Sequence, residues 1–281
     1  MGSAVTTIID HLFEQLWHIP IDLFAGVIWA APVWLVVRHL PARRRWRTTK
    51  YSLQPWRKPP PPRIVLSANQ SSKDDNGHHV SRTGLGQVQA LSLIAPSLAF
   101  AYKDSISHGA IQFATSVSPD SPLLEESDVI LIGGPKTNEI TRVVLESKEL
   151  AVGFQTKPKP EAQGGSVDVI SYKDPATGKI QELVTKGDDA YAIVIQFKNP
   201  LATSADRTMT LLAGSSTYGT ELAAMAFAAN SNLRKFVPYF KKRQGFVAVV
   251  SGKIAGDSSK DRWVKSQKVV FVDHFPFGGP K

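Results

Sequence analysis

The sequence predicts an α/β protein, with a mostly parallel sheet that carries an antiparallel hairpin insertion and is preceded by an N-terminal transmembrane helix. Three observations predict this class. Residues 23–37 form an apolar run without charge near the N-terminus. A proline-rich stretch follows, and beyond residue 62 apolar strand-like segments alternate with segments of helical periodicity. A chain of 281 residues is long enough for one sizeable domain with extensions.

The N-terminal region predicts two helices. Residues 1–18 favour an amphipathic helix, because their apolar side chains recur at helical spacing on one face. Residues 19–41 favour a transmembrane helix, since the flanking apolar residues lengthen the uncharged run to the thickness of a hydrocarbon layer, about 30 Å. Pro32 would kink this helix, which a membrane tolerates.

Charges on either side of the run predict its orientation. Asp10, Glu14 and Asp22 precede it, and the basic segment RHLPARRRWR follows it. The excess of arginine predicts a single-pass protein of the cell membrane, with the N-terminus outside and the C-terminal domain in the cytoplasm. An amphipathic segment on the membrane surface and a buried hairpin of two helices are the alternatives.

Residues 42–62 predict a basic and proline-rich linker. Of the formal charge of +9, eight positive charges lie between residues 38 and 58, which leaves the remainder near +1. The basicity therefore belongs to one segment, and nucleic acid is not an expected partner. The five prolines at 52–62 favour an extended spacer. The chain has no cysteine, which excludes disulfides, thiolate metal sites and cysteine nucleophiles.

Residues 63–281 predict a cytoplasmic α/β domain. A hairpin is expected at 166–186, around a turn with proline and glycine. Helices are expected at 82–104, 137–148 and 216–237, and Thr137 and Asn138 are the candidate caps of the second. The other expected strands are 63–69, 109–117, 128–135, 152–156, 190–200, 208–214, 245–254 and 268–275.

Two strand ends carry glycine and lead into a helix, at 132–134 and at 213–215. In a parallel sheet, ligands bind beyond the carboxyl ends of the strands. Glycine lets a ligand approach the backbone, and a helix N-terminus favours phosphate or carboxylate. The exit of the first strand and the turn at 82–86 are expected to converge on the same rim. The predicted ligand-binding residues are Ser67, Asn69, Gly133, Gly134, Pro135, Asn138, Gly214, Ser215, Ser216, Gly219 and Thr220.

The segments DVILIGGPKTNEITR and TLLAGSSTYGTELAA resemble the Rossmann-like superfamily of nucleotide sensors and nucleoside-processing enzymes, which includes SLOG domains and nucleoside deoxyribosyltransferase-like proteins. The resemblance covers residues 63 to about 250, and its motifs are short. It implies a nucleotide site lined by Gly133, Gly134, Asn138, Gly214, Ser215, Gly219 and Thr220. It also implies a setting such as bacterial stress or antiviral signalling, where membrane-tethered nucleotide receptors occur. Unlike the enzymes, this chain has no assignable catalytic glutamate with supporting residues.

The predicted function is a membrane-anchored cytoplasmic protein that binds and senses a nucleotide. One alternative is a hydrolase or transferase acting on nucleosides or nucleotides, with Glu139 or Glu221 as the catalytic candidate. The other is a non-catalytic, membrane-tethered interaction module. Expected partners are membrane lipid, a nucleotide or other phosphorylated small molecule, and further copies of the chain. No cofactor or metal is predicted, because His78 and His79 are poorly spaced to share an ion.

Overall fold

The computed structural model describes residues 62–66, 69–73, 79–102, 111–113, 121–146, 150–158, 166–174, 177–204, 207–228, 236, 238–239, 244–256 and 262–276. The chain divides between Arg47 and Thr48, and all of these residues belong to the second part. The amphipathic helix predicted at 1–18 and the transmembrane helix predicted at 19–41 lie outside the described residues, as does the linker up to residue 61.

The described elements are twelve strands and four helices. The strands are β1 (Arg63–Leu66), β2 (Asn69–Lys73), β3 (His79–Arg82), β4 (Ile111–Phe113), β5 (Val129–Ile132), β6 (Val152–Pro158), β7 (Ser166–Lys173), β8 (Ile180–Val184), β9 (Asp189–Lys198), β10 (Thr208–Gly214), β11 (Gln244–Ala255) and β12 (Trp263–Pro276). The helices are α3 (Leu85–Tyr102), α4 (Pro122–Glu125), α5 (Glu139–Glu146) and α6 (Thr217–Ala228).

The predicted fold class, a Rossmann-like and mostly parallel sheet, is wrong for this structure, and the transmembrane helix of that prediction lies outside the described residues. Strand dominates among the described elements, which form a mixed seven-stranded sheet and two antiparallel sheets. The large sheet has the order β12-β11-β9-β10-β5-β1-β4. Only β4, β1, β5 and β10 pair in parallel, whereas β10, β9, β11 and β12 pair antiparallel. No helix of the described part has the length and apolar character that a membrane crossing needs.

The physical reason for this correction lies in the connections. A parallel crossover needs about a dozen residues or more. Only residues 199–207 join β9 to β10, and only 256–262 join β11 to β12. Both connections are too short for a crossover helix, so each pair is antiparallel. These four strands were predicted, but as members of a mostly parallel sheet.

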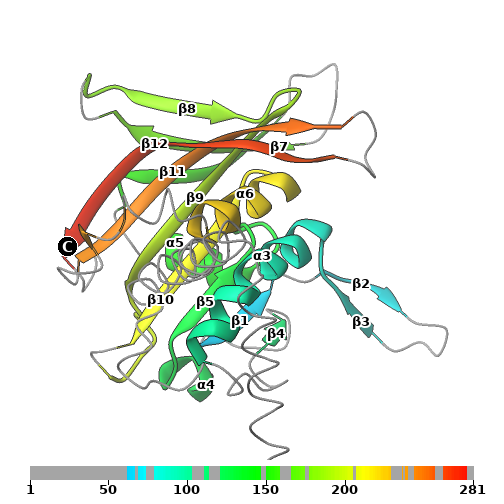
Figure 1. Cartoon of the computed structure of the whole chain (residues 1–281), viewed down its shortest axis with the longest axis vertical. Coiled ribbons are helices and arrows are strands. Elements are labelled where there is room, and N and C mark those ends of the chain that lie inside the picture. Colours follow the sequence, from blue (N-terminus) through cyan, green and yellow to red (C-terminus); the bar gives the residue numbers. More distant parts are fainter. Residues whose placement is uncertain are drawn as a thin grey trace, which may run out of the picture. The chain divides into compact units, whose positions relative to one another are not determined.

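Each face of the large sheet packs against a different partner. Alternate strand residues such as Ile130 and Leu212 join one core, which includes α3 and α6. Their neighbours Val129 and Leu211 join a second core, with α5 and residues of β6 and β7. This period of two is the reason that the central strands are apolar throughout. In Figure 1, α3 and α6 lie together on one face of the large sheet.

The two small sheets are antiparallel. Strands β6, β7 and β8 form one of them, and the hairpin predicted at 166–186 corresponds to β7 and β8. Strands β2 and β3 form the other, which extends away from the large sheet in Figure 1. Helix α3 contains Pro96 and still runs unbroken from Leu85 to Tyr102.

Candidate functional site

The parallel strands bring three strand exits to one edge of the large sheet, which we call the carboxyl edge. Ile132, the last residue of β5, is level with Leu66 of β1 and with Leu212 of β10. The turns that follow β5 and β10 are therefore neighbours. Strand order decides this relationship, and strand order is not visible in the sequence.

The turn after β5 contacts β10 directly. The amide of Gly133 donates a hydrogen bond to the carbonyl of Leu212 at 2.9 Å. Gly133 has φ of 124°, a backbone conformation that favours glycine. A Cβ atom on Gly134 would lie 3.2 Å from the carbonyl oxygen of Gly214 and 3.6 Å from the ring of Phe154. The two predicted glycine turns therefore touch.

Asn138 is the N-terminal cap of α5. It is one of the two cap candidates that the sequence predicted. Its side-chain Oδ1 accepts a hydrogen bond from the amide of Thr141 at 3.1 Å. Its own amide and that of Thr137 both donate to the carbonyl of Gly134. Asn138 is fully buried, and its Nδ2 has no hydrogen-bond partner in the structure as described. Pro135, also a predicted site residue, is half-buried in the same turn.

The hydroxyl groups after β10 are occupied within the protein. The Oγ of Ser215 lies 2.6 Å from Oγ1 of Thr185 and 3.3 Å from the carbonyl oxygen of Tyr191. The Oγ of Ser216 accepts a hydrogen bond from the amide of Gly219 at 3.1 Å and so caps α6. The predicted residue Thr220 is buried in the first turns of this helix, with its amide donating to the carbonyl of Ser216. These hydrogen bonds order the turn.

Two of the predicted site glycines have a packing reason. A Cβ atom on Gly214 would collide with the backbone of Gly219, and one on Gly219 would collide with the carbonyl oxygen of Tyr191. Glycine at both positions lets α6 start close against β10 and β9. Their presence is explained by helix–strand contact without a ligand.

The remaining predicted residues are not brought together. Ser67 lies outside the described residues, and of Asn69 only the backbone is described, at the start of β2. Glu139 is exposed and pairs with Arg142 one turn along α5. Glu221 is buried in α6 and accepts a hydrogen bond from the backbone amide of Val264 in β12. The two catalytic candidates therefore have different surroundings.

Burial raises the pKa of Glu221 above its ordinary value, and the hydrogen bond from Val264 offsets this only in part. Its Oε2 atom has no hydrogen-bond partner within the part of the chain that the structure covers. Because this buried carboxyl group is bonded to β12, it gives no support to a catalytic role at the glycine turns.

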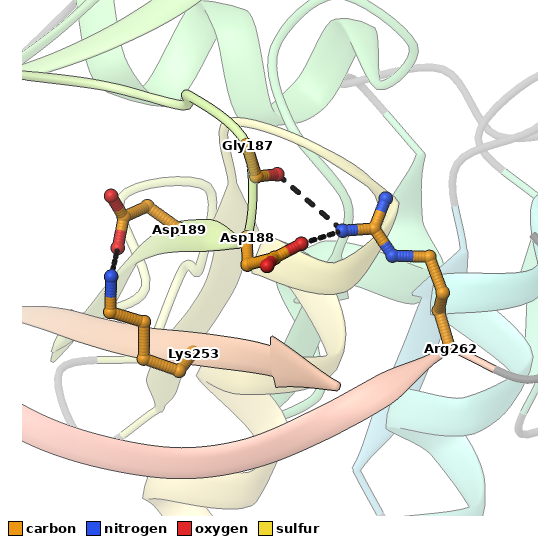
Figure 2. Close-up of polar contacts among 5 residues, drawn as sticks. All are labelled: Gly187, Asp188, Asp189, Lys253 and Arg262. Atoms are coloured by element: carbon orange, nitrogen blue, oxygen red, sulfur yellow. Dashed lines mark hydrogen bonds and ion pairs between the residues drawn. The ribbon is translucent and has the colours of Figure 1, made fainter. Parts of the chain in front are cut away.

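The sequence analysis missed a charged cluster at the same edge, where β9 and β12 begin. Figure 2 shows Arg262 reaching Asp188 and Gly187, and Lys253 reaching Asp189. The Arg262–Asp188 and Lys253–Asp189 contacts are each 2.6 Å long. Hydrogen bonding to Asp189 raises the pKa of Lys253. The partners are more than sixty residues apart along the chain, so no local sequence pattern could have joined them.

This cluster is balanced in charge, because two acids face two bases. The guanidinium of Arg262 also lies over the ring of Tyr218, 5.6 Å from its centre. Tyr218 belongs to the first turn of α6. The cluster therefore ties β9, β11 and β12 to the start of α6, beside the turn after β10.

No group of three or more histidine, cysteine or acidic residues that could hold a metal ion occurs among the described side chains. His78 lies outside them, and the side chain of His79 is not described. No protein-family model matches this chain, and no curated protein matches it in sequence.

Proposed function

We propose that the folded region 62–276 binds a small anionic molecule of the nucleotide class at the carboxyl edge. One observation carries this proposal: two glycine-bearing turns, each leading into a helix, touch at the ends of the parallel strands β5 and β10. Beyond the carboxyl ends of parallel strands is where open α/β sheets hold ligands. The antiparallel strand β9 also starts at this edge, beside the end of β10.

Electrostatics supports an anion at this place. Helices α5 and α6 both begin here, and a helix N-terminus carries the equivalent of about half a positive charge. Lys136, in the turn before α5, is exposed and positively charged. The nearby cluster around Arg262 is internally neutralised, so it does not oppose the anion.

The membrane anchor, the cytoplasmic placement and the sensing role stay predictions from the sequence. In that scheme, ligand binding at the carboxyl edge changes how membrane-tethered copies associate. Residues 1–41, which would supply the tether, lie outside the described part of the chain. The enzyme alternative gains no support from Glu139 or Glu221, because Glu139 is exposed and paired with Arg142, and Glu221 is buried against β12.

A thermal-shift screen of the full-length protein against nucleotides and dinucleotides tests the proposal. A bound ligand stabilises the folded state, by about 2.7 kcal/mol at a hundredfold excess over its dissociation constant. The ligand is recovered afterwards and analysed. An intact ligand supports binding without turnover, whereas a consumed ligand favours the enzyme alternative.

Two lysine variants locate the site. Lys136→Ala is expected to weaken binding because it removes positive charge from the turn before α5. Lys198→Ala is the matched control, since Lys198 ends β9 at the opposite edge of the sheet. The proposal fails if no nucleotide raises the melting temperature. The remaining alternative would then be the non-catalytic interaction module. The proposal also fails if both variants lose affinity equally.

A further inference from the structure

The amide group of Asn138 is only half used. Its oxygen caps α5 through the amide of Thr141, but its Nδ2 has no acceptor among the described residues. The whole side chain is buried, with an exposed fraction of 0%. A buried donor without an acceptor is costly and uncommon in folded proteins, so this nitrogen requires an explanation.

The same chain shows what a structural asparagine looks like. Asn199 is equally buried, and its Nδ2 donates to the carbonyls of Leu124 and Ser127 at 2.7 and 3.2 Å. Its oxygen accepts from the amide of Leu201. Every part of that amide is in use, at the opposite edge of the sheet. Asn138 differs from it only in the unused nitrogen.

The unused nitrogen belongs to the cap residue of a helix, and a helix start offers further donors. The first backbone amides of a helix have no acceptor within the helix, and Asn138 caps only that of Thr141. The amides of Glu139 and Ile140 belong to the same helix end. Donors of this kind suit the oxygens of a phosphate group. Arg142 pairs with the carboxylate of Glu139. This pairing reduces the repulsion between that carboxylate and a bound anion.

We propose that Asn138 Nδ2, together with the first amides of α5, binds a phosphate group of the ligand at the carboxyl edge. This assignment rests on the proposed function and goes further, because it names the part of the ligand that is recognised and the residue that recognises it. Lys136, exposed two residues earlier, supplies the charge that draws the phosphate to the turn.

The buried position of Nδ2 requires the adjacent turn to yield when the phosphate enters. Within that turn, the amides of Thr137 and Asn138 both donate to the carbonyl of Gly134, at 3.2 and 3.1 Å. Its outer residues Lys136 and Thr137 are exposed. These exposed residues are the ones that would have to shift.

Nuclear magnetic resonance of the full-length protein tests this inference through the side-chain amide protons of Asn138. The probes are inorganic phosphate, AMP and adenosine, with sodium chloride at matched ionic strength as the blank. We expect phosphate and AMP to shift the Asn138 amide protons and to slow their exchange with solvent. Adenosine, which lacks the phosphate, leaves them unchanged. The Asn199 amide protons are the internal control and stay constant throughout.

Two variants separate the missing donor from added charge. Asn138→Ser and Asn138→Asp both keep an oxygen that caps α5 but remove the nitrogen. Asn138→Ser is expected to weaken phosphate binding about tenfold, the usual effect of losing one hydrogen bond to a charged group. Asn138→Asp weakens it further by repulsion. Circular dichroism confirms that each variant is folded.

The outcomes distinguish this inference from the proposed function. If AMP binds but the Asn138 protons do not move, or if Asn138→Ser keeps full affinity, the inference is wrong and the proposed function stands. In that case the nitrogen is met by a buried water. If neither phosphate nor any nucleotide of the screen perturbs residues 133–141, both proposals are overturned.

Discussion

Gly86 of α3 lies against the carbonyl group of Thr217, the first residue of α6, so closely that a Cβ atom at position 86 would collide with that oxygen. Two helices that start more than a hundred residues apart in sequence therefore begin side by side at the carboxyl edge. Thr217 follows the cap residue Ser216, so this contact also helps to place the turn after β10.

Gly86→Ala is expected to destabilise the protein by about 1–3 kcal/mol, because the added methyl group meets backbone and cannot be accommodated by a side-chain rotation. The urea midpoint, measured with an unchanged m-value, reports this loss. Gly84→Ser is the matched control two residues away. There the nearest atom is the movable end of Gln87, and serine is a good cap, so the midpoint stays or rises slightly. Equal losses in both variants would contradict the close contact.

Ser216→Ala is expected to cost about 1 kcal/mol, because the amide of Gly219 loses the oxygen that caps it. Ser216→Asp restores a capping oxygen and places a negative charge at the helix N-terminus, so it recovers the stability of the wild type. Thermal unfolding of the three proteins compares them. A Ser216→Ala protein as stable as the wild type would show that Ser216 does not cap α6.

The raised pKa of Glu221 leads us to expect that stability depends on pH in a specific way. Its folded pKa is raised by burial above the ordinary value of 4.5, so the folded state binds the proton more tightly than the unfolded state. The contribution of Glu221 to the free energy of unfolding is therefore fully present below pH 4.5. It is lost as the pH rises through the raised folded pKa.

Glu221→Gln removes this titration while it keeps an oxygen for the amide of Val264. The free energy of unfolding of the variant minus that of the wild type should therefore increase as the pH rises above 4.5. Taking the difference cancels the titration of the other groups. A difference that is constant or falls with pH would mean that the pKa of Glu221 is not raised.

The Arg262–Asp188 pair is expected to contribute little by charge alone. The side chain of Asp188 is 68% exposed and that of Arg262 is 27% exposed. A double-mutant cycle with Arg262→Ala and Asp188→Ala should give a coupling of about 0.2–1 kcal/mol that decreases with salt. Arg262→Ala alone should cost more than Asp188→Ala, because it also loses the contact with Tyr218. Equal single losses would show that the ring contact contributes nothing.

Several elements were predictable because their reasons are local. The apolar run of β5 and the glycines after it mark a buried strand and its turn. The proline–glycine turn within 166–186 sets the β7–β8 hairpin, and an asparagine just before an amphipathic helix marks the cap of α5. In each case the side chains that decide the structure lie within a few residues of one another.

The balance of parallel and antiparallel strands was not predicted, although the short connections after β9 and β11 carry that information. The packing role of Gly219 could not be predicted, because the backbone of Tyr191 that excludes a side chain there arrives from another strand. The cluster around Arg262 had no local signal for the same reason.

By itself, the sequence determined elements whose signals are local, such as β5, α5 and the β7–β8 hairpin, and it marked two turns suited to an anion. Only the tertiary structure decided that these turns are neighbours, because strand order places β10 beside β5. It also decided that Ser215 and Ser216 are occupied and that the nitrogen of Asn138 is not. The local sequence determines which hydrogen-bond donors exist, whereas packing between distant segments determines which of them have a partner within the protein.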